Sequence, residues 1–128
     1  MVDLVVTCPK GFWADWIAEG DAAGGPESGE EWAWYGSGLI PPIGWPGDRL
    51  YVVAHDRLRG YAPVTRLELG PLKPRNRPNG RDGRSWMICR RGGAVAVTLS
   101  EPVRGFQGWR HRWWPREAEL PFPDWRTP

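Results

Sequence analysis

The sequence holds no apolar run that approaches the roughly 20 residues needed by a membrane-spanning helix. Its first residues, Met1–Thr7, lack the basic start, the long apolar stretch and the small-residue cleavage site of a signal peptide. These absences predict a cytoplasmic protein with no membrane partner.

Residues that bind metals are also scarce. The two cysteines (Cys8 and Cys89) and the two histidines (His55 and His111) share no ligand-like spacing. Without a secretory signal, both cysteines are expected to be buried free thiols rather than a disulfide. No nucleophile motif and no glycine-rich phosphate loop is present. The sequence therefore predicts no metal and no cofactor, gives no catalytic residue, and favours binding over catalysis.

Lysine is rare as well, because fifteen of the 17 basic residues are arginine. Arginine offers a planar fork to phosphate and stacks on aromatic rings, which lysine does not. Residues 1–32 hold one basic and seven acidic residues, whereas residues 49–116 hold fifteen basic and four acidic ones. Ten tryptophans in 128 residues exceed what packing requires. Together these features indicate nucleic acid or a modified nucleotide as the partner.

The order of patterns indicates a single α+β domain over residues 1–128. An amphipathic helix is predicted over residues 9–20, with Trp13 and Trp16 on its buried face. A basic loop is expected at 70–84 and an aromatic, arginine-rich segment at 104–128. Strands are predicted over residues 2–7, 31–35, 49–55, 58–69, 85–90 and 93–99.

Hairpin turns join several of these strands, one at Asp56-Arg57 and another at Arg90-Arg91-Gly92-Gly93. Six short strands with such connections predict a small, mostly antiparallel, strongly bent β-barrel with one or two covering helices.

Three stretches of the sequence carry a resemblance to a known superfamily. They are Trp13–Gly20 (WADWIAEG), Pro46–Val53 (PGDRLYVV) and Leu58–Val64 (LRGYAPV). In this order they resemble the PUA-like superfamily, which includes the ASCH, EVE and YTH domains. The resemblance implies a curved barrel whose cleft binds RNA, a flipped base or a modified nucleoside. Some ASCH members are amidohydrolases of acetylated cytidine, but the run that carries their catalytic lysine, threonine and glutamate has no counterpart here.

The predicted site combines stacking rings, polar rim groups and phosphate contacts. The wall is expected to consist of Trp45 with Trp109 or Trp113, and the rim of Tyr35 or Ser37. Phosphate contacts are predicted for Arg75, Arg77, Arg81, Arg84, Arg110 and Arg112. Two alternatives stay open: a small hydrolase acting on a modified nucleoside, and a protein-interaction or inhibitor domain that uses the same tryptophans and arginines.

Overall fold

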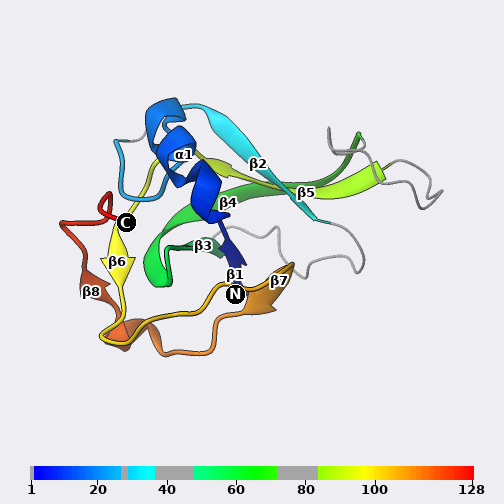
Figure 1. Ribbon diagram of the computed structural model, residues 1–128. Helices are drawn as coiled ribbons and strands as arrows, with labels where there is room; N and C mark the ends of the chain where they lie inside the picture. The colour runs from blue at the N-terminus through cyan, green and yellow to red at the C-terminus, as the bar shows by residue number, and fades with distance from the viewer. Residues whose placement is uncertain (1, 27–28, 37–47, 72–83) are drawn as a thin grey trace.

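The computed structural model describes residues 2–26, 29–36, 48–71 and 84–128, and Figure 1 shows how its elements are arranged. Strands dominate, and there is one short α-helix in the described ranges. Along the chain the elements are β1 (Asp3–Thr7), η1 (Lys10–Phe12), α1 (Trp13–Glu19), β2 (Glu31–Gly36), β3 (Arg49–Ala54), β4 (Arg57–Pro71), β5 (Arg84–Arg91), β6 (Val97–Thr98), β7 (Trp109–His111), η2 (Arg116–Ala118) and β8 (Leu120–Pro121).

The main sheet has six strands in the order β2-β5-β4-β3-β1-β7. Only β1 and β3 pair in parallel, and the other four pairings of this sheet are antiparallel. The register shifts between Val52 and Val53 in β3 and between Val64 and Arg66 in β4. Such irregularities bend a strand and increase its twist. The described strands curl into an open half-barrel (Figure 1). This confirms the mostly antiparallel, strongly bent α+β architecture, although the half-barrel is not closed.

The helix predicted over residues 9–20 is present as η1 followed by α1. Trp13 is 1% exposed, and Trp16 packs half-buried against the same core, as their spacing predicted. The helix ends at Gly20, which adopts a left-handed conformation (φ 85°) and donates its backbone N–H to the Ile17 carbonyl. Glycine takes this conformation without steric penalty, so residue 20 is a favourable place for the chain to leave the helix.

The hairpin of β3 and β4 has its turn at His55-Asp56, one residue before the predicted position. Both residues have positive φ values, 49° and 59°. A two-residue turn of this hand matches the twist of the strands on either side. The side chains of histidine and aspartate tolerate this region better than most, which is why the turn forms without glycine.

The prediction of a second hairpin around Arg90-Arg91-Gly92-Gly93 is wrong. Strand β5 already pairs with β2 on one side and β4 on the other, so the chain after it has no place beside it. Residues 92–94 instead bind the segment before β2, where Gly92 donates to the Glu30 carbonyl at 2.9 Å. Of the strand expected over 93–99, only Val97–Thr98 forms, and it pairs with β8.

Two hydrophobic clusters lie on the two faces of the sheet, because alternate residues of β1 and β3 point to opposite sides. Cluster 1 contains residues of both strands together with the helix: Leu4, Val6, Cys8, Trp13, Ala22, Leu50, Val52, Ala54, Val64, Ile88 and Trp125. Cluster 2 contains Val5, Tyr51, Val53, Leu58, Val103 and Trp114. A strand buried on both faces explains why residues 4–6 are all apolar.

Both cysteines are free thiols and buried, as predicted. In the part of the chain that the structure describes, no helix has the length and apolar character to cross a membrane.

Candidate ligand-binding face

The predicted site residues fall partly outside the described residues. Trp45, Ser37, Arg75, Arg77 and Arg81 all lie in ranges of which the structure gives no account. Arg84 begins β5, and its side chain is not described either. The roles predicted for these six residues therefore stay predictions.

The remaining predicted residues lie at opposite ends of the sheet. Tyr35 is on β2, whereas Trp109 and Arg110 are on β7, and four strands separate β2 from β7 in the sheet order. Trp109 is half-buried and packs against cluster 1. Trp113 is 53% exposed, and its ring centroid lies 6.2 Å from that of Phe106.

Arg110 and Arg112 differ in what they contact. The Arg110 guanidinium is stacked over the Phe106 ring at 4.4 Å, and its side chain is on an exposed residue. Arg112 donates from Nε to the buried carboxylate of Asp3 at 2.8 Å. Of these two guanidinium groups, only that of Arg110 is available at the surface, where it lies over Phe106.

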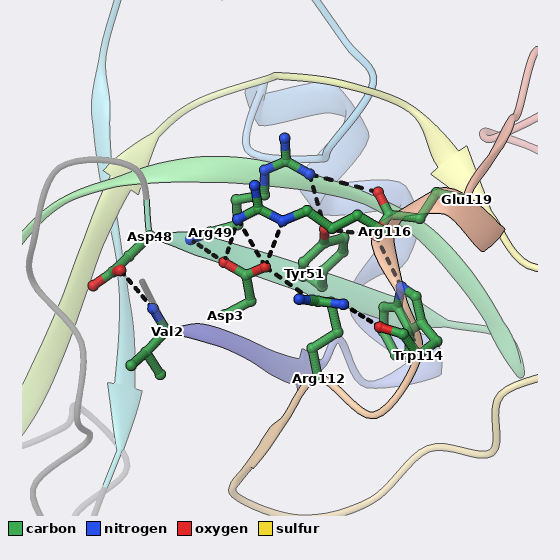
Figure 2. Close-up of polar contacts among 9 residues, drawn as sticks. All are labelled: Val2, Asp3, Asp48, Arg49, Tyr51, Arg112, Trp114, Arg116 and Glu119. Carbon is green, nitrogen blue, oxygen red and sulfur yellow. Dashed lines mark hydrogen bonds and ion pairs between the residues drawn. The ribbon is translucent and has the colours of Figure 1, made fainter.

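Asp3, the first residue of β1, is the centre of a polar network (Figure 2). Its carboxylate also accepts from Arg116, through Nε at 3.0 Å and Nη2 at 2.9 Å, and from the backbone N–H of Arg49 at 3.2 Å. Four donors around one buried carboxylate satisfy it fully and join β1 to the C-terminal segment. We interpret this part of the network as structural.

The second half of the network is built on Glu119 (Figure 2). This carboxylate accepts from the Tyr51 hydroxyl at 2.6 Å and from Trp114 Nε1 at 2.9 Å. Burial, followed by the bond to Glu119, raises the pKa of Tyr51 above its usual value. Arg49 donates to the same hydroxyl at 3.1 Å. Every polar group here has a protein partner, which again indicates a role in stability.

A different arrangement is found where α1 faces the β2–β5 pair. Trp32 and Trp34 alternate along β2 and so share one face of it, and their cross-strand partners on β5 are Arg90 and Ile88. Trp86 is on the same face, opposite Gly36. The helix supplies Trp16, whose ring lies 5.3 Å from the Arg90 guanidinium carbon. We call the four half-buried residues Trp16, Trp32, Trp34 and Trp86 the tryptophan-lined face.

The absence of a side chain at Gly36 makes room for the Trp34 ring. A Cβ at this position would lie 2.6 Å from Cζ3 of Trp34. The Trp34 indole therefore lies over Gly36, which is the last residue of β2 and the cross-strand partner of Trp86.

A buried ion pair lies at the base of this face. Arg90 is 1% and Asp21 7% exposed, and Arg90 Nη2 is 2.5 Å from Asp21 Oδ1. The contact brings the charges together without hydrogen-bond geometry at Oδ1. Burial lowers the pKa of Arg90, and burial raises the pKa of Asp21 although the nearby guanidinium opposes that shift. Such a pair is costly to desolvate and is therefore weak as a stabilising device.

Two buried donors, one on Arg90 itself and one on its cross-strand partner, have no acceptor among the described residues. They are Nη1 of Arg90 and Nε1 of Trp32. Leaving a buried donor unmet costs about 1–3 kcal/mol, so each of these donors calls for an acceptor from outside the described residues, such as a water, an ion or a ligand atom. Ionisable groups with a perturbed pKa cluster at functional sites, which makes the half-buried tryptophans around this pair a candidate binding site.

One pattern in the sequence points to this face: the alternation in Glu31-Trp32-Ala33-Trp34-Tyr35, which places both tryptophans on one side. Tyr35, predicted at the rim, belongs to the other face, opposite Met87. Arg90 carried no such signal, because it becomes a neighbour of Trp32 only through the pairing of β2 with β5.

No family model matches this sequence, and neither a curated protein nor a solved structure matches it. The function of the tryptophan-lined face is therefore argued from its own residues.

Proposed function

We propose that this protein is a binding module for nucleic acid or a modified nucleotide, and that the tryptophan-lined face holds the base. The observation that carries the proposal is the set of four half-buried indoles on α1 and the β2–β5 pair, two of which, Trp16 and Trp32, lie next to the buried Arg90. Flat apolar rings stack on any base, and each stacked base contributes about 1–3 kcal/mol. Donors at the base of the face would then distinguish one base from another.

Fixed placement of the rings supports a binding role. Trp16 is held by the helix, and Trp32, Trp34 and Trp86 by paired strands. Rings on rigid elements lose little conformational freedom when a ligand stacks on them, so more of the contact energy remains as affinity.

Phosphate groups would be bound by exposed arginines, as part of the same proposal. Arg91 follows Arg90 on β5 and is exposed, and Arg110 is exposed over Phe106. The arginines predicted for the 70–84 loop, namely Arg75, Arg77, Arg81 and Arg84, remain candidates for the same role. Arg112 is a weaker candidate because Asp3 already binds it.

The assignment to the PUA-like superfamily is also a proposal. A helix that directly follows the first strand, a bent sheet and the β3–β4 hairpin support it. The two buried free thiols support the proposed location in the reducing cytoplasm.

Fluorescence anisotropy with labelled single-stranded RNA and DNA tests the proposal. The wild-type protein should bind at low salt, and log K should fall with log salt in proportion to the number of phosphates contacted. Trp32→Ala should weaken binding at least about tenfold, equivalent to about 1.4 kcal/mol. Trp113→Ala is the matched comparison, because it removes an indole that is more exposed and that follows β7, the strand at the opposite edge of the sheet from β2.

Thermal unfolding of both variants shows whether loss of binding reflects loss of folding. If Trp113→Ala abolishes binding and Trp32→Ala does not, the C-terminal segment is the site and the tryptophan-lined face is not. If the wild type binds neither RNA nor DNA at low salt, the proposed function is wrong.

A further inference from the structure

The two residues that carry the unmet donors are neighbours across the β2–β5 pair. Trp32 and Arg90 are directly opposite each other in the antiparallel pairing of β2 and β5. Side chains in such positions have Cβ atoms about 5 Å apart and point to the same side of the sheet. Arg90 is 1% exposed, and neither its Nη1 nor Trp32 Nε1 finds an acceptor among the described residues.

The chemistry of these two groups restricts what can meet them. The indole Nε1–H is only a donor, and a guanidinium has donors but no acceptor. A hydroxyl oxygen has two lone pairs and could accept from both, but it brings a hydrogen of its own that neither group can accept, whereas an aromatic amino group accepts from neither. An oxygen with two lone pairs and no hydrogen is therefore the complementary ligand atom.

The charge around Arg90 selects between a neutral and an anionic oxygen. Asp21 lies 2.5 Å from the guanidinium, so the carboxylate already compensates its charge. A phosphate brought to this position would add negative charge beside a buried carboxylate, which is unfavourable in a poorly solvated site. A neutral carbonyl oxygen on a flat ring meets both donors without that penalty, and the ring then stacks on the indoles.

We propose that the tryptophan-lined face is specific for bases with a keto oxygen, which accepts from Trp32 Nε1 and Arg90 Nη1. This inference rests on the proposed function and adds the class of base to it. Both donor atoms are covered in the structure, so the base reaches them by displacing part of the surrounding side chains. A base with an amino group at the same position would place donors against donors and leave all of them unmet.

Two RNA hexamers that differ at this edge of the base test the inference: hexainosine, with a keto oxygen at C6 and a hydrogen on N1, and hexaadenosine, with an amino group at C6 and no hydrogen on N1. Anisotropy titrations at one salt concentration should show that the wild type binds hexainosine at least about tenfold more tightly, since an unmet buried donor is costly. Equal phosphate number removes backbone charge as a cause of the difference.

Trp32→Phe removes the donor and keeps an aromatic ring, so it should reduce the preference to less than about threefold. Trp34→Phe is the matched control, because the same change on the next inward-facing residue of β2 removes no unmet donor. It should weaken both hexamers by a similar factor and leave their ratio unchanged. Thermal unfolding of both variants confirms that they fold.

The outcomes separate the two proposals. Equal binding of the two hexamers, or a wild-type ratio that persists in Trp32→Phe, overturns the keto preference and leaves base binding intact. Loss of the ratio in both phenylalanine variants also overturns it, because ring area and not the donor would then set the preference. If neither hexamer binds, the proposed function fails and this inference fails with it.

Discussion

Arg59 and Arg90 are each 1% exposed, although both belong to the segment whose positive charge suggested a basic surface. Arg59 donates to the carbonyls of Ala54, Trp125 and Thr127, which binds the end of the chain to the hairpin. The sequence shows that arginine is abundant. It could not show which arginines bind buried acceptors, because those acceptors are distant in the chain.

Cys8 allows a test of burial at the scale of one residue. Burial and, to a smaller extent, the charge of Asp21 raise its pKa from 9.0 to about 12. In the folded protein at pH 8 the thiol should therefore stay protonated and resist alkylation by iodoacetamide. Peptide mass spectrometry should find Cys8 modified only after unfolding in guanidinium chloride. Rapid modification of the folded protein would show that the helix does not cover this thiol.

The same shift has a consequence for stability. Since the pKa is higher in the folded state, the thiol contributes stability that is fully present below about pH 9 and is lost as pH rises toward 12. The free energy of unfolding should therefore fall less steeply between pH 8.5 and 10.5 in Cys8→Ala than in the wild type. Urea titrations across that range measure the difference.

At the scale of elements, the pattern within each segment predicted the helix and the strands well, but the sequence did not show which strands pair. The helix and β1 to β5 follow from local periodicity and turn residues, and all of them are present near the expected residues. The expected hairpin after β5 fails because β4 and β2 occupy both of its edges. Which strand pairs with which depends on contacts across the chain, and alternation within a strand carries no information on them.

Gly93 tests how the turn after β5 is held. Its φ is 75°, and a Cβ there would contact the Pro26 carbonyl oxygen and lie 2.7 Å from that of Gly25. Gly93→Ala should therefore cost more than the roughly 1 kcal/mol of backbone strain alone. Gly108→Ala is the matched control, because its φ is 72° but a Cβ would meet no described atom within 4 Å. Urea unfolding that gives equal losses for the two variants would show that the turn does not pack against 25–26.

At the scale of the whole molecule, part of the uneven charge of the sequence is neutralised by ion pairs within the fold. Acidic residues of the first third bind arginines of the second half, in the pairs Asp3–Arg112, Asp3–Arg116, Asp21–Arg90 and Glu31–Arg66. A surplus of eleven positive charges over 49–116 therefore overstates the positive surface. The count of ten tryptophans likewise overstates the number of indoles that a ligand can reach, since Trp13, Trp114 and Trp125 are core residues.

The C-terminal segment closes the core on both faces of the sheet, since Trp114 belongs to cluster 2 and Trp125 to cluster 1. The Trp125 ring also meets that of Trp13 edge-on at 6.0 Å. Trp125→Ala should destabilise the protein by about 3–5 kcal/mol, whereas Trp113→Ala, at a 53% exposed residue, should cost less than about 1.5 kcal/mol. Chemical denaturation measures both. Similar losses would mean that exposure does not report the packing role of these indoles.

The most direct test of the account is to observe all ten indole N–H groups while a nucleic acid binds. In a ¹⁵N-labelled sample each tryptophan gives one indole signal, and assignment by single Trp→Phe substitutions identifies it. Titration with a single-stranded RNA hexamer should shift the signals of Trp16, Trp32, Trp34 and Trp86, with Trp32 moving most because its Nε1–H gains an acceptor. The signals of Trp113 and Trp125 should stay in place. Shifts concentrated at Trp109 and Trp113, with the tryptophan-lined face unchanged, would contradict the account and return the site to the C-terminal segment.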